Sequence, residues 1–296
     1  MGMTDAHREA LGALRRSWGR MDGKTALVTG ATRGIGLETA RRLALLGADV
    51  LVQARDAARG APALAAVRAA SRPGAEPALC VADLGSAADV LRLAGEVRRD
   101  RPRLDVLVAN AGVFAPERTE TADGLELTFA VNVVAPLLLA TRLLPALRAA
   151  APARVVVLSS ASHWTGEIHW DDLQLARPGA FTALRAYDQS KLAVLMLTLA
   201  LARRLDGGDV TAVCLDPGDV ATSMLAAGWP AISGIPVQDG AVTSVYLASS
   251  PAAAGLTGVY LEGGEVVTPL AAALDVPAQE RLWAALEHLT GPLMGV

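Results

Sequence analysis

The sequence has few aromatic residues, few cysteines and no large excess of charge of one sign. Of its 296 residues, 4% are aromatic and two are cysteine. Cys80 and Cys214 each stand in an apolar run, and such cysteines in a chain without an export signal favour buried small side chains over a disulfide. The 27 basic and 30 acidic residues leave a net charge of -3. This balance excludes a global basic field of the kind that binds nucleic acid or an anionic membrane.

An uncharged apolar run of about 20 residues, long enough to cross a membrane, is also missing. The densely apolar segment 192–202 is 11 residues long, and the uncharged stretch 240–261 is interrupted by serine, proline and glycine. The first twenty residues carry several charges, among them Asp5, Arg8 and Glu9, so they lack the apolar region of a signal peptide. We therefore expect a soluble, cytoplasmic protein with no membrane span.

The apolar residues that are present make up 52% of the chain, which is ample for a core and excludes a disordered protein. Short apolar runs alternate with longer segments in which apolar residues recur at spacings of three and four, as in amphipathic helices. Such alternation, with strands that are apolar throughout, is typical of a parallel sheet buried on both faces. We predict an α/β fold with a Rossmann-type doubly wound parallel sheet of about seven strands, at 25–29, 50–53, 78–81, 106–109, 154–159, 210–215 and 259–261.

The chain shows no linker rich in proline, glycine or serine that would divide it. We expect an N-terminal arm at 1–22 and a single catalytic domain at 23–296. A domain of this type needs about 250 residues, and the surplus falls in the arm, in an insertion at 162–186 and in the tail beyond Glu262. The glycine- and proline-rich stretch 224–238 is expected to form a mobile lid over the active site.

A glycine-rich turn follows the first predicted strand and precedes a helical pattern. A strand, turn and helix in this order present backbone N–H groups and the positive end of a helix dipole to a phosphate, and glycines allow a pyrophosphate to approach closely. The spacing, three residues and then one between the glycines, differs from the commoner dinucleotide pattern. We predict a dinucleotide site formed by Gly30, Thr32, Arg33, Gly34, Ile35 and Gly36.

The end of the second predicted strand bears on which dinucleotide binds. Ala54 stands where a carboxylate would hydrogen-bond the adenosine ribose of NAD and repel the 2′-phosphate of NADP. Arg55 beside it and Arg33 in the glycine turn supply two guanidinium groups, which suit a phosphate dianion. The alternative is that both arginines are solvated surface charges. We predict NADP (NADPH) as the cofactor.

A second group of residues carries candidate chemistry. Tyr187 and Lys191 are four apart in a helical pattern, so they share one face of a helix. A phenol is a poor acid or base at neutral pH unless a neighbouring cation stabilises the phenolate, and Lys191 can supply that cation. Ser160 ends one apolar strand, the segment 110–112 ends the strand before it, and Asn132 lies in the helix between them. The carboxyl ends of parallel strands are where an open α/β sheet binds its ligands.

These motifs together resemble the short-chain dehydrogenase/reductase family over nearly all of the chain after Lys24. The glycine spacing is similar to that of the compact single-domain members. The family's further elements are present in order, as Asp83-Leu84 after the third strand, Asn110-Ala111-Gly112, and Pro217-Gly218 followed by Val220 and Thr222.

The resemblance implies a catalytic set of Asn132, Ser160, Tyr187 and Lys191. Tyr187 would be the general acid or base at the substrate oxygen, which Ser160 would hold and polarise. Lys191 would lower the pKa of Tyr187 and bind the nicotinamide ribose, and Asn132 would position a water that links Lys191 to solvent. The resemblance also implies contacts with the adenine from Asp83 and Leu84, with the cofactor backbone from Asn110, Ala111 and Gly112, and with the nicotinamide from Pro217, Gly218, Val220 and Thr222.

Within the family, the chain looks like retinol dehydrogenases and WW-domain-containing oxidoreductase. The stretches 162–166 and 170–174 carry this likeness, and Ser160 and Tyr187 are separated by 27 residues (187 − 160), more than is usual in the family. Those relatives mostly convert lipophilic aldehydes, ketones and alcohols with NADP. Their membrane-anchoring N-terminal helix is not matched here, so we expect a soluble relative whose substrate stays open.

Two other functions remain possible on the same residues. One is a biosynthetic tailoring enzyme of natural-product metabolism, which catalyses epimerisation or redox-coupled cyclisation. The other is a non-enzymatic NADP-binding protein, which the presence of all four catalytic-type residues disfavours.

Several side chains also allow more than one interpretation. Trp164, Trp170 and Phe181 of the insertion, with His163 and Trp229, either line an apolar cleft or pack the insertion on the domain. His163 and His169 lack a third ligand at metal spacing, so we expect no metal site. The apolar segment 192–202 serves either the core or an interface of a homodimer or homotetramer, which relatives of this type commonly form.

Overall fold

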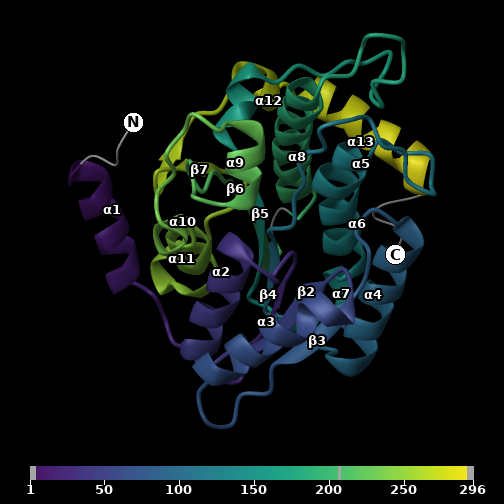
Figure 1. The fold of residues 1–296 in the computed structure, drawn as a ribbon. Coiled ribbons are helices and arrows are strands. Elements are labelled where there is room, and N and C mark those ends of the chain that lie inside the picture. Colours follow the sequence, from purple (N-terminus) through teal and green to yellow (C-terminus); the bar gives the residue numbers. More distant parts are fainter. Residues whose placement is uncertain (1–4, 206–207, 292–296) are drawn as a thin grey trace.

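The computed structural model describes residues 5–205 and 208–291, with side chains from residue 8 onward; residues 1–4 of the expected N-terminal arm lie outside the described residues. Within this part of the chain, eight strands form one sheet in the order β3-β2-β1-β4-β5-β6-β7-β8 (Figure 1). The strands are β1 Thr25–Val28, β2 Asp49–Ala54, β3 Ala78–Val81, β4 Val106–Ala109, β5 Ala153–Leu158, β6 Val210–Leu215, β7 Tyr260–Glu262 and β8 Glu265–Val267.

The strands from β3 to β7 pair in parallel, and β8 pairs antiparallel with β7. The predicted doubly wound α/β fold is confirmed. Because β1 lies between β2 and β4, the order of the strands reverses there, which is the place where such sheets bind ligands. The strand missed by the prediction is β8, which has three residues, follows the turn at Gly263 and Gly264, and exposes Glu265 and Val266. No apolar run marks it in the sequence.

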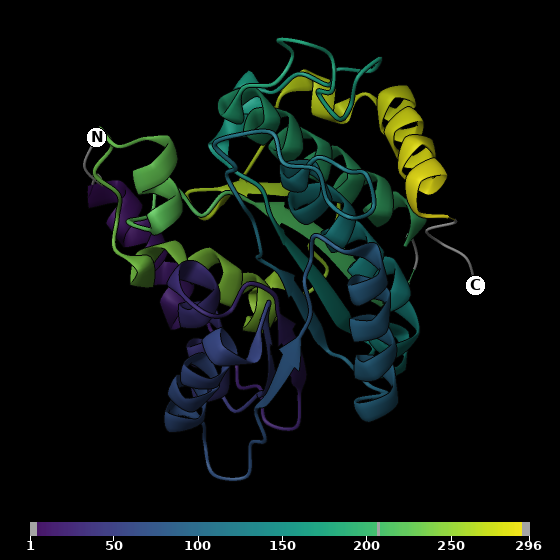
Figure 2. The same cartoon turned by 45° about the vertical axis from the view of Figure 1, so that its right-hand side comes forward.

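Helices cover both faces of the sheet (Figure 2). Side chains alternate along each strand, since Ala26 and Val28 of β1 belong to the core under α2, whereas Leu27 belongs to the core under α8. A strand buried in this way needs apolar residues at every position. One face carries α2 (Gly34–Leu45), α3 (Ala57–Ala70) and α11 (Val242–Ser249), and the other carries α4 (Ala87–Asp100), α6 (Ala135–Arg142) and α8 (Ala183–Arg204).

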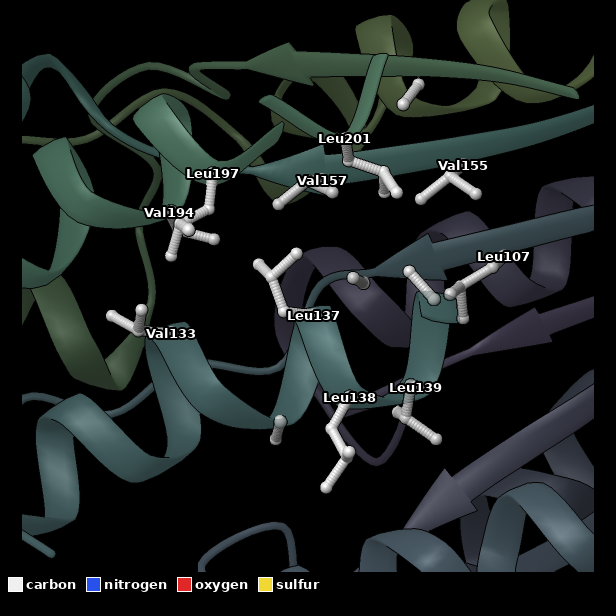
Figure 3. Packing of buried hydrophobic residues seen from close by; sticks show 14 of the residues in the cluster. Leu107, Val133, Leu137, Leu138, Leu139, Val155, Val157, Val194, Leu197 and Leu201 are labelled. Atoms are coloured by element: carbon white, nitrogen blue, oxygen red, sulfur yellow. The ribbon is translucent and has the colours of Figure 1, made fainter. Parts of the chain in front are cut away.

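Helix α8 carries Tyr187 and Lys191 and is buried from Ala186 to Ala202. Its apolar side chains meet those of α6 and β5, as Val194, Leu137 and Val157 show in Figure 3. The helices α12 (Ala271–Leu274) and α13 (Val276–Thr290) also pack against it. The segment 192–202 therefore belongs to the core of the single chain and is not exposed as an interface.

The described part of the N-terminal arm is a helix, α1 (Asp5–Arg16), which packs against α11. Arg15 pairs with Asp239 of α10 (Val237–Gly240).

In residues 5–205 and 208–291, no single helix is long and apolar enough to span a membrane. The pair Leu127–Arg142 and Leu144–Ala150 reaches the required length and composition only when its two helices are taken together, and it is bent by 53°. That pair comprises α5 (Leu127–Phe129), the π-helical turn η1 (Ala130–Val134), α6 and α7 (Leu144–Ala150); a short 3₁₀ turn, η3, lies at Pro251–Ala253.

Candidate active site

The turn between β1 and α2 has the geometry that its glycines permit. Gly30 and Gly34 have φ angles of +62° and +57°, in the left-handed region that favours glycine. A Cβ at Gly36 would lie 2.5 Å from the carbonyl oxygen of Gly30, so a side chain there would push α2 off the turn. Thr32 is half-buried in the turn, and Ile35 lines the cleft described below. The first turn of α2 therefore has the form that holds a pyrophosphate in dinucleotide-binding proteins.

Gln53 braces this turn, although in the sequence it is marked only as the end of a strand. Its side chain is buried, accepts a hydrogen bond from the Gly30 N–H at 2.8 Å and donates one to the carbonyl oxygen of Ala82 at 2.8 Å. The amide thus connects the glycine turn with the residue that precedes Asp83. A polar residue inside the apolar run 50–54 is the signal that could have found it.

The corner formed by the ends of β1 and β2 is rich in unpaired positive charge. Arg33 and Arg55 are exposed, and among the described residues neither guanidinium makes an ion pair or a hydrogen bond. Ala54 is buried and provides no acid. The acid that follows, Asp56, caps α3 by accepting from the Arg59 N–H at 2.8 Å. This corner can therefore accept a phosphate without displacing an existing partner.

The predicted adenine contacts lie at the carboxyl end of β3. Asp83 is exposed, and its Oδ1 accepts a hydrogen bond from the Gly85 N–H at 2.9 Å, whereas Leu84 is buried. These two residues follow Ala82, which Gln53 ties to the glycine turn.

The loop after β4 is tied to the glycine turn. Asn110 donates from Nδ2 to the carbonyl oxygen of Thr29 at 2.8 Å, and the Ala111 N–H donates to Thr29 Oγ1 at 3.0 Å. Gly112 continues the loop toward α8, where a Cβ at this position would lie 3.7 Å from Lys191 Nζ. The three residues thus run from the glycine turn to the catalytic-type side chains.

Ser160, Tyr187 and Lys191 meet at the carboxyl edge of the sheet. Tyr187 and Lys191 lie one turn apart on α8, with Lys191 Nζ 5.4 Å from the centroid of the Tyr187 ring, and both side chains are buried. Ser160 follows β5, and its hydroxyl interacts with the phenol. Lys191 Nζ donates to the carbonyl oxygen of Leu158 at 3.1 Å. The structure therefore brings together the three residues that the sequence grouped.

Burial controls the protonation of both groups on α8. It raises the pKa of Tyr187 above its ordinary value, while the hydroxyl of Ser160 acts in the opposite direction. Burial lowers the pKa of Lys191 to about 8, against the attraction of Cys214 and Asp216. Desolvation of the phenolate is thus the largest influence on the pKa of Tyr187. Tyr187 is protonated at neutral pH and is able to donate its proton.

Asn132 lies in η1, a π-helical turn of the kind that is frequent at functional sites. Its Oδ1 accepts from the Val113 N–H at 2.8 Å, and its Nδ2 donates to the Val113 carbonyl oxygen and to Ser190 Oγ, both at 3.0 Å. These bonds hold the loop after β4 against α8. Asn132 therefore reaches the helix between Tyr187 and Lys191.

A cleft of about 300 Å³ opens at these side chains. Ser160, Tyr187 and Ile35 line it, so it joins the glycine turn to the catalytic-type residues. The segment after β6 forms the opposite part of the lining, with the predicted nicotinamide contacts Pro217, Gly218, Val220 and Thr222.

Three residues of the predicted lid 224–238, Met224, Leu225 and Trp229, line the cleft. The first helix of the lid, α9 (Ser223–Gly228), places Met224 Sδ 3.5 Å from the hydroxyl of Tyr187, which donates to it. The rings of Tyr187, Trp229 and Phe114 pack together with centroids 5.3 to 5.7 Å apart. Phe114 was not among the predicted residues; its place two positions after Gly112, in the loop that passes Lys191, is the signal that could have found it. The hydroxyl and ring of Tyr187 are therefore covered by apolar side chains.

The insertion 162–186 packs mainly on the rest of the domain. In this respect its aromatic residues differ from Trp229, which lines the cleft. His163 is fully buried against β7, Trp164 donates from Nε1 to the same strand, and Trp170 lies under a guanidinium of α13 at 4.3 Å. Phe181 is half-buried, and Trp229 lines the cleft. In the described part of the chain, no group of three or more histidine, cysteine, aspartate and glutamate side chains could hold a metal ion, and both cysteines are free.

Asp216 is an ionisable group of the cleft that was not predicted from the sequence. It is 6% exposed and lines the cleft with Ser160 and Tyr187. Burial raises the pKa of Asp216 to about 6, although the backbone N–H groups of Gly218 and Ala161 act to lower it. Its charge also favours the protonated forms of Tyr187 and Lys191. An acid directly before the Pro-Gly pair is the signal in the sequence.

The reversal of strand order, the glycine turn and the Ser160, Tyr187 and Lys191 cluster define an oxidoreductase of the dinucleotide-binding α/β class. Comparison with known proteins bears this out, since residues 24–172 match the family model for short chain dehydrogenases. The chain is 37% identical to retinol dehydrogenase 14 of Homo sapiens over 301 residues, covering 93% of this chain and 88% of that protein. The chain therefore belongs to the short-chain dehydrogenase/reductase family, whose members use nicotinamide cofactors and small-molecule substrates.

Solved structures agree with this assignment. A putative uncharacterized protein from Mycobacterium paratuberculosis superposes with a TM-score of 0.79 at 30% identity, covering 95% of this chain and 98% of that chain. The Pseudomonas aeruginosa RhlG/NADP active-site complex superposes with a TM-score of 0.67 at 29% identity, covering 83% of this chain and 96% of that chain. The sequence comparisons thus show the family, and the superpositions show the fold.

Proposed function

We propose that this protein is an NADPH-dependent oxidoreductase that transfers a hydride between the nicotinamide and a lipophilic carbonyl compound or alcohol. The observation that carries the proposal is a cleft lined by Ser160 and Tyr187, which also reaches Ile35 of the glycine turn and has Lys191 beside the ring of Tyr187. NADPH supplies the hydride when it is bound. The protein supplies the binding groove, the orientation of the substrate oxygen and the proton.

Each side chain of the cluster has a role that follows from its position. Tyr187, kept protonated by burial, donates its proton to the substrate oxygen during reduction and takes it back during oxidation. Ser160 hydrogen-bonds the same oxygen and orients it toward the phenol. Lys191 places a cation beside the ring of Tyr187 and faces the loop after β4, along which the nicotinamide ribose would lie. Asn132 fixes that loop through its two bonds to Val113.

The choice of NADP over NAD rests on the corner formed by β1 and β2. Arg33 and Arg55 are exposed there, make no ion pair with any described residue and suit the 2′-phosphate, and Ala54 removes the carboxylate that NAD would require. The similar RhlG structure is a complex with NADP. Binding of the pyrophosphate at the glycine turn is supported by the positive φ angles of Gly30 and Gly34 and by the position of the turn at the N-terminus of α2.

A lipophilic substrate is supported by the walls of the cleft. Met224, Leu225 and Trp229 of the lid line it, and Phe114 backs the ring of Trp229. The chain is similar to retinol dehydrogenase 14, and the retinol in the name of that protein is a lipophilic alcohol. The cytoplasmic location, the single catalytic domain and a homo-oligomer stay predictions from the sequence, and a homo-oligomer would have to use a surface other than the buried segment 192–202.

The direct test is oxidation of NADPH by the purified protein with a panel of lipophilic aldehydes and ketones, with the reverse reaction on the matching alcohols. We expect turnover with NADPH, slower turnover with NADH, and a product two hydrogens heavier than the carbonyl substrate. The tailoring alternative would give a product of another mass or an epimer of the same mass. A non-enzymatic NADP-binding protein would bind NADPH and leave the whole panel unchanged.

A further inference from the structure

His163 is a buried titratable residue next to Ser160 that the proposed reaction does not use. It lies in the short 3₁₀ helix η2 (Ala161–Thr165) and is 0% exposed. Its Nδ1 lies 2.8 Å from the backbone carbonyl oxygen of Ser160, and its own backbone N–H donates to the same oxygen at 3.0 Å. Because a carbonyl oxygen can only accept, Nδ1 carries the proton of the neutral ring.

The surroundings of the ring favour this single state. The ring packs on Trp164 and Tyr260 at centroid distances of 4.5 and 4.7 Å. Burial lowers the pKa of His163, against the attraction of Glu262 on β7. With the proton on Nδ1, Nε2 is left as an acceptor, and within the described residues neither Nε2 nor the buried hydroxyl of Tyr260 has a hydrogen-bond partner. The ring is thus neutral and fixed in one tautomer.

The carbonyl that His163 holds belongs to the residue that presents the hydroxyl of Ser160. Ser160 caps η2, and its Oγ accepts a hydrogen bond from the Ser162 N–H at 3.2 Å. The rotamer of Ser160 therefore depends on the path of η2, which is held on the α8 side by the bond of 2.9 Å from Thr165 Oγ1 to Asp188. His163 holds the opposite side, toward β7.

The position of His163 separates it from the substrate. Ser162 and Thr165, its neighbours in η2, line the cleft, whereas the ring of His163 is enclosed between η2 and β7. The ring can act on the reaction only through the backbone of Ser160.

We propose that His163 is a positioning residue, whose Nδ1–H holds the carbonyl group of Ser160 so that the serine hydroxyl points at the substrate oxygen. The proposal rests on the proposed function, because it assigns the orientation of Ser160 a part in hydride transfer. A displacement of about 1 Å in a catalytic group can cost up to about a hundredfold in rate. The loss is expected in kcat, since NADPH binds to the glycine turn and the corner of β1 and β2.

Two variants test this role. His163→Leu fills the space but removes the donor, and His163→Asn places an amide N–H near the position of Nδ1. We expect kcat to fall by roughly tenfold to a hundredfold in His163→Leu and to recover by at least about threefold in His163→Asn, with the Kd for NADPH unchanged in both. His169→Leu is the matched control on the same insertion. Only the backbone N–H of His169 binds Gln189, so this variant should keep the kcat of the wild type.

Thermal unfolding separates positioning from a merely structural role. A structural role would lower Tm in His163→Leu while the folded fraction keeps its kcat, and that result overturns the proposal. If His163→Leu does not fold, His163→Asn decides: a kcat of at least about a thirtieth of the wild type, with a pH profile of the wild-type shape, supports the proposal, and any other result contradicts it. Absence of turnover in the wild type with every carbonyl compound would instead contradict the proposed function, which keeps the two failures distinct.

Discussion

The hydroxyl of Tyr187 donates a hydrogen bond to the sulfur of Met224 at 3.5 Å. The atom that would protonate the substrate is thus already turned into the cleft, with a weak acceptor from the lid in the place of a substrate oxygen. Thioethers are poor acceptors, so a carbonyl oxygen held by Ser160 can displace the sulfur. The hydrogen bond between Tyr187 and Met224 must then break when substrate binds.

Replacing Met224 by alanine tests this competition. Met224→Ala removes the sulfur, and a net hydrogen bond of roughly 0.5 to 1 kcal/mol corresponds to a fall of about threefold in KM for a small aldehyde. The KM for NADPH should not change. Steady-state kinetics with one small aldehyde measures both values, and Ser223→Ala, an exposed neighbour in α9, is the control. An unchanged or higher KM for the small aldehyde would mean that Met224 does not compete with substrate.

The proposed preference for NADP over NAD can be tested at Arg55. Arg55→Asp removes a partner of the 2′-phosphate and adds a carboxylate that repels it, so KM for NADPH should rise by at least about tenfold, as expected for loss of one or two charge-assisted bonds. KM for NADH should change little or fall. Steady-state kinetics with both cofactors provides the comparison. Equal effects on NADPH and NADH would contradict the assignment.

The ionisation of Lys191 predicts how the rate depends on pH. Burial lowers the pKa of Lys191 to about 8, so its ammonium is present below that pH and is lost as the pH rises through it. The pKa of Tyr187 is raised, so the phenol stays protonated over the same range. The kcat/KM for carbonyl reduction should therefore fall above about pH 8, measured from about pH 6 to about pH 10. A profile that is flat through this range would show that the charge of Lys191 is not required.

Asp216 predicts a separate pH dependence, that of stability. The pKa of Asp216 is raised from 3.8 to about 6. Its protonated carboxyl therefore contributes fully to the free energy of unfolding below the unfolded pKa of 3.8, and this contribution is lost as the pH rises through about 6. Asp216→Asn removes the cost of the buried charge and should stabilise the protein at pH 8 by up to about 3 kcal/mol, since one pKa unit is about 1.4 kcal/mol.

Thermal unfolding of both proteins across the pH range measures this effect. The difference in Tm between Asp216→Asn and the wild type should be several degrees at about pH 8 and should become small near about pH 3, below the unfolded pKa of 3.8, where the carboxyl is largely protonated in both the folded and the unfolded state. A difference that is constant with pH would indicate a packing effect of the substitution.

The sequence predicted the elements whose residues carry a local pattern. The strands β1 to β7 were found because each is apolar on both faces, and Tyr187 and Lys191 were placed on one helix by their spacing. The short β8 was missed because it is exposed and lies at the edge of the sheet. The role of segment 192–202 stayed open until the structure showed α12 and α13 packed on α8.

The site residues that the sequence missed depend on contacts between distant segments. Gln53 acts on Gly30, 23 positions earlier in the chain, and Phe114 meets Trp229 only because the lid folds back over the loop after β4. The spacing of residues along the sequence does not predict such contacts. Asp216 could have been singled out as an acid directly after an apolar strand, but its burial in the cleft follows from the packing of β6 against its neighbours.

The most direct test of the proposed chemistry is the Tyr187→Phe variant, measured for both turnover and NADPH binding. Removing one hydroxyl takes away the proton donor and leaves the ring that packs on Phe114 and Trp229. We predict that NADPH oxidation with the best carbonyl substrate falls by at least about a thousandfold, within the range of general acid catalysis and its supporting hydrogen bond. The Kd for NADPH should stay within about twofold of the wild type. Turnover within about tenfold of the wild type would contradict the role of Tyr187 and with it the proposed chemistry.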